Sequence, residues 1–280
     1  MRVDAHTHVF PTWLRDQRAG HLERDTTFAA LYASPKARMS TSEELLESMD
    51  RADVDASVMA GIGWTDIDLA RSVNDYLLKA ATDSHGRLLA FCSVNPAWGT
   101  AAVVEAQRCI EAGAAGIGEL HPDSQGFDLS DKTTMAPLME IAERSQLPVL
   151  VHASEPVGHA YDGKGNTTPR LLWDFVQNFP TNVIILAHWG GGLPFYSLMP
   201  EVGRALENVY FDSAASPFLY RPSVYATVAG LVGAERVLWA SDFPLLDQQR
   251  SLDEFAGQPL TEEEHRLIEG GNAARLLGLE

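Results

Sequence analysis

Residues 183–188 read Val-Ile-Ile-Leu-Ala-His, a run that is apolar at every position except the last. Seven other short β-rich runs are spread along the chain, and longer segments with a helical pattern separate them. Strands that are apolar on both faces are typical of a buried parallel sheet. The eight predicted strands are Val3–Val9, Ala56–Gly61, Leu88–Val94, Ala115–Leu120, Pro148–Ala153, Val183–His188, Val209–Ser213 and Val237–Asp242.

The segments between these runs carry apolar stripes at helical spacing, such as Leu69, Val73 and Leu77. Dividing 280 residues by eight gives about 35 residues per unit, which suits a strand, a helix and two loops. These units predict an α/β fold of the (β/α)₈ TIM barrel type, which has about 250 residues. A doubly wound sheet is the alternative. We expect one domain over residues 1–280, and a lid or binding loop in the long irregular stretch Phe10–Ser40.

Composition excludes several function classes. The chain has 21 Lys and Arg against 38 Asp and Glu, a formal net charge of −17, which disfavours nucleic acid or an anionic membrane as partner. The apolar runs are far shorter than the roughly 20 residues that span a bilayer, and no signal peptide is expected at the N-terminus. Cys92 and Cys109 are expected to be buried reduced thiols. These features predict a cytoplasmic protein.

Polar side chains stand where the predicted strands end, which is where TIM barrels build their active sites. His6 and His8 are two residues apart on the first strand, so period-two alternation turns both imidazoles toward the barrel axis. Later strands end with Glu119, His152, His188 and Asp242.

This combination of residues predicts a metal centre. Two carboxylates in a barrel mouth are costly to bury unless a cation accompanies them. Imidazole nitrogen and carboxylate oxygen are ligands of Zn²⁺, and they also suit Mn²⁺, Fe²⁺ or Co²⁺. A single strand-end histidine is more often a hydrogen-bonded structural group, but six such residues at five strand ends favour ligands. The predicted ligands are His6, His8, Glu119, His152, His188 and Asp242.

The same motifs resemble the amidohydrolase superfamily, and within it the amidohydrolase-related family that includes aminocarboxymuconate semialdehyde decarboxylase. The resemblance spans nearly the whole chain. It rests on Asp4-Ala-His-Thr-His8, His152 in PVLVHAS, His188 in ILAHWGG, Asp242 in WASDFP and the closing GGNAARLLGL. It implies a (β/α)₈ barrel with one divalent metal, usually zinc, on residues matching His6, His8, His152 or His188, and Asp242.

The fourth strand departs from one branch of this family. Many relatives resemble Gly-x-Lys-Leu-His-Pro at this point, whereas residues 118–122 read Gly-Glu-Leu-His-Pro. Superfamily members with two metals use a carboxylated lysine or a glutamate on this strand as a bridging ligand. The resemblance therefore implies that Glu119 can bridge two ions, with His152 and His188 on the second. The alternative is that Glu119 accepts a hydrogen bond from a ligating histidine.

Hydrolysis of an amide, lactam or lactone is the expected reaction, because a divalent cation lowers the pKa of water toward neutrality. Asp242 and His188 are the expected catalytic groups, with Asp242 taking a proton and returning it to the leaving group. The alternative within the family is non-oxidative decarboxylation, in which an acid protonates the carbon that loses CO₂. A non-catalytic metal-binding barrel and a TatD-like nuclease are further alternatives, and the acidic charge disfavours the nuclease.

Six residues are candidate substrate contacts. The polar loop 154–166 follows the fifth strand, and its side chains either bind substrate or are simply solvated. Asp212 ends the seventh strand and either contacts substrate or orients a ligand histidine. The candidates are His121, His159, Tyr161, Lys164, Trp189 and Asp212.

Charge along the chain is uneven. Residues 9–41 hold five basic and three acidic side chains, a local excess of two positive charges. A mildly basic lid over a cationic metal predicts a small anionic substrate, such as a carboxylate. A homo-oligomer is compatible with these features.

Overall fold

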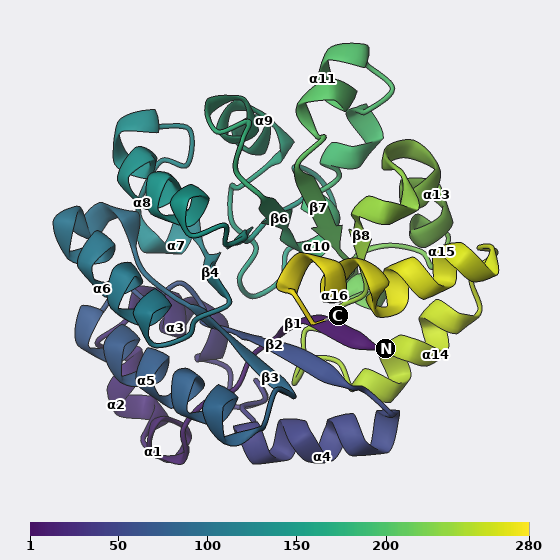
Figure 1. The fold of residues 1–280 in the computed structure, drawn as a ribbon. Coiled ribbons are helices and arrows are strands. Elements are labelled where there is room, and N and C mark those ends of the chain that lie inside the picture. The colour runs from purple at the N-terminus through teal and green to yellow at the C-terminus, as the bar shows by residue number, and fades with distance from the viewer. Residues whose placement is uncertain (280) are drawn as a thin grey trace.

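The computed structural model describes residues 1–279, in which eight parallel strands pair in chain order (Figure 1). A bridge between Thr7 of the first strand and Phe243, in the segment that follows the last strand, brings the two edges of the sheet together. The fold is the predicted (β/α)₈ TIM barrel. Its strands are β1 (Val3–Thr7), β2 (Ala56–Ala60), β3 (Leu88–Cys92), β4 (Gly116–Leu120), β5 (Val149–Val151), β6 (Ile184–Leu186), β7 (Val209–Asp212) and β8 (Val237–Leu238).

Every predicted strand is present, and all eight are shorter than expected, three of them by half or more. The β5 and β6 strands keep three residues each and β8 keeps two. The chain leaves the hydrogen-bond ladder early at these strands because the next residues turn toward the barrel mouth. His188 and Asp242 follow β6 and β8 with φ of 54° and 63°, which no β-strand residue adopts.

Helices follow the strands and pack around the barrel (Figure 1). The predicted stripe at Leu69, Val73 and Leu77 lies on the buried face of one of them. The larger helices are α4 (Ser42–Ala52), α5 (Ile67–Asp83), α6 (Thr100–Glu111), α8 (Lys132–Arg144), α9 (Pro169–Asn178), α13 (Val224–Val232) and α14 (Gln248–Ala256). The shorter ones are α1 (Thr12–Asp16), α2 (Arg18–Leu22), α3 (Thr26–Tyr32), α7 (Pro122–Gln125), α10 (Ala187–Gly190), α11 (Pro200–Ala205), α12 (Ser216–Leu219), α15 (Glu262–Arg266) and α16 (Asn272–Leu277).

Two apolar layers hold the barrel together. The larger lies between the strands and the surrounding helices. The smaller includes Val58, Phe91 and Leu150 from three different strands, together with Ala273 and Ala274 of α16. This second layer is the barrel interior, and α16 covers its end beside the N-terminus (Figure 1). The opposite end, where the strands finish, is left for polar side chains.

The stretch Phe10–Ser40 was expected to be irregular, but it contains the helices α1, α2 and α3. Asp25 caps α3 by accepting a hydrogen bond from the Phe28 amide at 2.8 Å. The ring of Tyr32 packs on Phe28 at 5.2 Å and on Phe10 at 4.9 Å. This aromatic cluster fixes the stretch against the barrel mouth, where Tyr32 lines the cavity.

Within residues 1–279, no helix combines the length and the apolar character needed to cross a bilayer. Cys92 and Cys109 are both free and buried.

Candidate active site

A cavity of about 430 Å³ opens at the end of the barrel where the strands finish. Its floor is polar, with His8, Glu119, His152, His188 and Asp242. Its walls are largely apolar and come from two sources. The segment after β1 contributes Leu31, Tyr32 and Ala37, and the segments after β7 and β8 contribute Phe218, Leu219 and Leu245.

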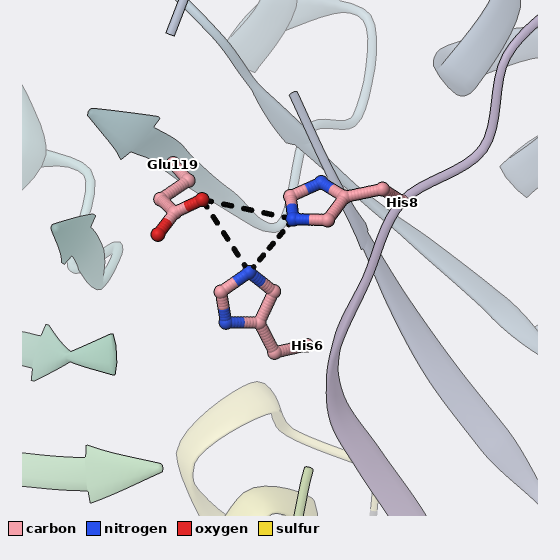
Figure 2. Close-up of side chains that lie close together, drawn as sticks. All are labelled: His6, His8 and Glu119. Carbon is pink, nitrogen blue, oxygen red and sulfur yellow. Dashed lines mark hydrogen bonds and ion pairs between the residues drawn. The ribbon is translucent and has the colours of Figure 1, made fainter. Parts of the chain in front are cut away.

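Three side chains on the floor point at one another (Figure 2). The Nε2 atoms of His6 and His8 lie 3.1 Å apart, and each is 3.6 Å from Glu119 Oε2. All three residues are buried. Ala5 packs in the barrel interior, so strict alternation would turn His6 outward. A register shift between Asp4 and Thr7 brings both imidazoles to the same point.

The other oxygen of Glu119 faces a second pair of histidines. Its Oε1 atom lies 3.0 Å from His152 Nδ1 and 3.7 Å from His188 Nε2. Asp242 Oδ1 lies 3.4 Å from His8 Nε2 on the cavity side. The structure therefore brings together all six predicted ligands. Five form two groups that share the Glu119 carboxylate, and Asp242 lies beside His8.

The donor set fits a cation, as the histidine tautomers show. His6 Nδ1 lies 2.9 Å from the Asp212 carboxylate, and His8 Nδ1 lies 3.0 Å from the Ala60 carbonyl. Both acceptors require an N–H at Nδ1, so each neutral ring presents a bare lone pair at Nε2. Two lone pairs 3.1 Å apart, beside a carboxylate, repel each other unless a positive charge lies between them. Histidine ligands are oriented in this way around metals.

The pKa shifts within the cluster also favour a positive charge at this point. Burial lowers the pKa of His6, but the carboxylates of Asp212 and Glu119 outweigh burial, and the pKa lies well above its ordinary value. Burial raises the pKa of Glu119, but the charge on His6 and the hydrogen bond from His152 bring it well below the ordinary value. Burial and the charge on His6 lower the pKa of His8. The carboxylates of Asp212 and Glu119 thus favour a positive charge at His6.

The backbone holds two of these side chains in left-handed conformations. The His188 amide donates to Asp212 Oδ1 at 2.9 Å, and the Asp242 amide donates to the His6 carbonyl at 3.0 Å. Non-glycine residues with positive φ cost of order 1–3 kcal/mol and gather at functional sites. Asp212 thus contacts both His6 and His188 and does not line the cavity. This placement favours its alternative role, the orientation of a ligand histidine, over contact with substrate.

Asp4 is a support that the sequence interpretation missed. Its carboxylate is fully buried and accepts hydrogen bonds from Ser241 and from Gln248 Nε2, the latter at 2.8 Å. Burial raises the pKa of Asp4 to about 6, against the opposing effect of these hydrogen bonds. Asp4 ties β1 to the segment that carries Asp242. In the sequence, only its place in the motif Asp4–His8 pointed to a role for Asp4. Its partner Gln248 lies at the other end of the chain, so their contact could not be predicted.

Three predicted substrate contacts line the cavity, namely His121, His159 and Tyr161. His121 stacks on His152 with ring centroids 4.0 Å apart, and its Nδ1 atom is 2.8 Å from Ser124 Oγ. Its Nε2 atom is buried and has no hydrogen-bond partner within residues 1–279. Burial, with a smaller contribution from His152, lowers the pKa of His121 to about 3, so this ring is neutral.

Two further predicted contacts lie elsewhere. Trp189 is fully buried, and its indole N–H donates to Ser216 Oγ at 3.0 Å, so it packs behind the cavity. Lys164 Nζ donates to the carbonyls of Val157 and His159, so it braces its own loop. Positive φ at Trp189 turns its ring away, a conformation that its sequence does not signal.

The family model "Amidohydrolase" matches residues 3–279. The chain belongs to the amidohydrolase family. Gamma-resorcylate decarboxylase of Rhizobium radiobacter is 26% identical over 259 residues, which cover 76% of this chain and 77% of that protein. Among solved structures, 5-carboxyvanillate decarboxylase from Sphingomonas paucimobilis is similar with a TM-score of 0.81 at 18% identity, covering 99% of this chain and 98% of that one.

Dihydroxybenzoic acid decarboxylase from Polaromonas sp. JS666 is similar with a TM-score of 0.77 at 18% identity, covering 99% of this chain and 97% of that one. That structure holds manganese and the inhibitor 2-nitroresorcinol. The protein is therefore an enzyme of the amidohydrolase superfamily, and its buried His/Glu cluster supports a divalent metal. The expectation of hydrolysis is wrong, because the curated proteins that this chain resembles in sequence are decarboxylases.

Proposed function

We propose that this amidohydrolase is a metal-dependent, non-oxidative decarboxylase of small hydroxylated aromatic acids. The observation that carries the proposal is the cavity itself, in which apolar walls lead down to a cluster of imidazoles and carboxylates. An aromatic acid fits this cavity, because its flat ring can pack between the apolar walls while its carboxylate reaches the polar floor. The similarity to gamma-resorcylate decarboxylase supports the same choice.

His6, which is fully buried, and the five floor residues are the proposed ligands of the cation. The floor residues are His8, Glu119, His152, His188 and Asp242. When bound, a divalent metal supplies positive charge that holds the anionic oxygens of the substrate. Nitrogen and oxygen ligands suit both Zn²⁺ and Mn²⁺. Manganese in the Polaromonas decarboxylase supports Mn²⁺ as the first ion to test.

Asp242 is the proposed proton donor. It lines the cavity and remains partly accessible, whereas Asp4 and Asp212 are fully buried and hydrogen-bonded. In the reaction, the bond between the ring carbon and the carboxylate breaks, and its electron pair forms a C–H bond with the proton from Asp242. CO₂ leaves, and Asp242 regains a proton from solvent. The unpartnered Nε2 of His121 is placed to hydrogen-bond a substrate oxygen.

Lys36 and Arg38 support an anionic substrate. Both line the cavity and both are exposed. The segment that carries them is held in place by Arg18, which donates to the carbonyls of Ser34 and Ala37 at 3.1 and 2.8 Å. Positive charge at the mouth raises the local concentration of a small anion.

The test is release of CO₂ from gamma-resorcylate and 5-carboxyvanillate by protein loaded with Mn²⁺ or Zn²⁺. We expect release that a chelator abolishes and that fails in an Asp242→Asn variant. An amide and a lactone of similar size serve as controls. Metal-loaded protein that hydrolyses the controls and releases no CO₂ from any hydroxybenzoate would overturn the proposal.

The metal content decides the role of Glu119. Two ions per chain would make Glu119 the shared ligand, because each of its oxygens faces one pair of histidines. One ion per chain would leave Oε1 as the acceptor for His152. Elemental analysis of purified protein, repeated on a His152→Ala variant, separates these arrangements.

A further inference from the structure

His121 is a cavity residue whose ring still has a free nitrogen. It directly follows β4, and its ring stacks on that of the proposed ligand His152 with centroids 4.0 Å apart. The residue is 2% exposed, and its Nε2 atom has no hydrogen-bond partner in the part of the chain that the structure describes. An unpaired buried nitrogen costs free energy, which a ligand oxygen that bonds it recovers. The exact position of this ring therefore decides how a substrate oxygen is bound.

The side chain of Gln125 joins His121 to two other segments of the barrel mouth. Its Oε1 atom accepts a hydrogen bond from the His121 amide at 2.8 Å. Its Nε2 atom donates to the carbonyl of Trp64, after β2, and to that of Val94, after β3, both at 3.0 Å. A glutamine amide offers one acceptor oxygen and two N–H donors, which match this one N–H and these two carbonyls. Glutamate has no donor for the carbonyls, and methionine has neither group.

Gln125 is itself held in place. It is 5% exposed, its backbone amide donates to the His121 carbonyl at 2.9 Å, and its carbonyl accepts from Asn95 Nδ2 at 3.0 Å. Every polar group of Gln125 is therefore hydrogen-bonded. Its side chain cannot turn without breaking bonds to the neighbouring segments, so it is a fixed support for the backbone of His121.

Two further residues complete the surroundings of His121. Gly63 has a φ of 75°, and a Cβ atom there would lie 2.7 Å from His121 Cβ and 2.9 Å from His121 N. Only glycine lets the backbone pass this close. Ser124 Oγ lies 2.8 Å from His121 Nδ1. Gln125 thus fixes the backbone of His121, and Ser124 fixes the orientation of its ring.

We propose that Gln125 and Ser124 are positioning residues of the active site, which hold His121 so that its Nε2 atom meets an oxygen of the substrate. The inference rests on the proposed function, in which His121 is a substrate contact. Neither Gln125 nor Ser124 lines the cavity, so each acts through His121. Misplacing a group that orients the substrate by about 1 Å can lower the rate about 10²-fold.

The first test is a double-mutant cycle on CO₂ release from gamma-resorcylate by the metal-loaded chain. Gln125→Met keeps the length of the side chain and removes its three hydrogen bonds, so we expect kcat/KM to fall by about 10²-fold with unchanged metal content. His121→Phe keeps a ring to stack on His152 and removes the free nitrogen. Adding Gln125→Met to His121→Phe should then lower kcat/KM by at most about twofold. Losses that multiply in full would overturn the proposal, because they would show that Gln125 does not act through His121.

The second test uses a milder variant. Ser124 is half-buried, so Ser124→Ala removes a hydroxyl without changing the core. We expect kcat/KM to fall by about tenfold in the wild-type background and to stay constant in the His121→Phe background. Ser130→Ala is the matched control, because Ser130 is also half-buried and its hydroxyl donates to Asp128 at 2.7 Å, away from the cavity. Equal losses in Ser124→Ala and Ser130→Ala would overturn the role of Ser124.

Binding of 2-nitroresorcinol separates failure of this inference from failure of the proposed function. Calorimetric titration of the same variants in Mn²⁺ requires no turnover. Weaker binding in Gln125→Met and Ser124→Ala, but only while His121 is present, would support the inference even if no CO₂ were released. CO₂ release with fully multiplying losses would overturn the inference alone. A chain that neither releases CO₂ nor binds 2-nitroresorcinol would overturn both.

Discussion

Two buried glutamates of this protein, Glu105 on α6 and Glu119 on β4, are stabilised in different ways. Glu105 is 1% exposed and Glu119 is 3% exposed. Glu105 accepts from Asn74 Nδ2 at 2.9 Å and from Arg108 Nη2 at 2.8 Å. Glu119 instead faces four histidine rings.

The pKa of both carboxyls lies below the ordinary value, for different reasons. Burial raises the pKa of Glu105, but hydrogen bonds from Arg108 and Asn74 outweigh it. Arg108 is a permanent cation within the chain, so the Glu105 pair is complete. Three of the four rings around Glu119 hydrogen-bond through Nδ1 to acceptors elsewhere in the barrel. The fourth, His152, uses its Nδ1 atom to contact Glu119 itself. Glu105 is therefore structural, because its charge is balanced by a cation within the chain. Glu119 belongs to a functional site, because the residues around it still require a cation.

The largest expected effect comes from removing the charge of Glu119. Glu119→Gln should lower decarboxylation by about 10³-fold, because the cation loses a negatively charged neighbour. The melting temperature should change little, since the ligands lie at the barrel rim. CO₂ release and metal content check both expectations. Glu105→Gln is the paired control and should keep its metal, so equal metal loss in both variants would contradict the distinction.

Removing Glu105 should act on stability instead. Glu105→Ala leaves Asn74 and Arg108 without their acceptor, although Arg108 is 43% exposed and regains water. We expect the free energy of unfolding to fall by about 2 kcal/mol. Urea denaturation measures this value. Glu111→Ala, on the exposed end of the same helix, should change it by less than about 0.5 kcal/mol.

A smaller effect is expected at Asp212, which acts on the site through His6. Asp212→Asn replaces an acceptor by a group that can present N–H to His6 Nδ1, which would favour the wrong tautomer. Metal affinity should fall by about 10- to 100-fold, as competition with a chelator would show. Asp253→Asn on the surface of α14 controls for the lost charge. Unchanged affinity in Asp212→Asn would mean that the ring orientation does not depend on this bond.

The smallest effect is a pH dependence at Glu105. Its pKa is lower in the folded protein than the roughly 4.3 of an unfolded chain, so its contribution to stability is full above that pH. The contribution is lost as pH falls through the folded pKa. The stability gap between wild type and Glu105→Gln, measured by urea denaturation, should therefore narrow below about pH 4. A gap that stays constant down to pH 3 would contradict this sign.

Much of the site was predictable because parallel strands bring distant residues to one rim. His6, Glu119 and His188 are far apart in sequence, yet each lies in or directly after a run that the apolar pattern identifies as a strand. Lys164 and Trp189, two predicted substrate contacts, do not line the cavity. Their positions depend on loop conformation and positive φ, which a chain pattern does not encode. The reaction class was predicted wrongly, since ligand types alone do not separate hydrolysis from decarboxylation.

The sequence by itself determined the barrel and the residue types at its mouth, because strand periodicity and chain length admit few other arrangements. One domain over the whole chain, a cytoplasmic location and the absence of nucleic-acid partners stay predictions. The tertiary structure decided which carboxylate serves which role. Asp212 and Asp242 both end strands, but only Asp242 lines the cavity. Asp212 is turned away from the cavity by its hydrogen bonds with His6 and with the His188 amide. Both partners lie on other parts of the barrel, so no local sequence pattern predicts these bonds.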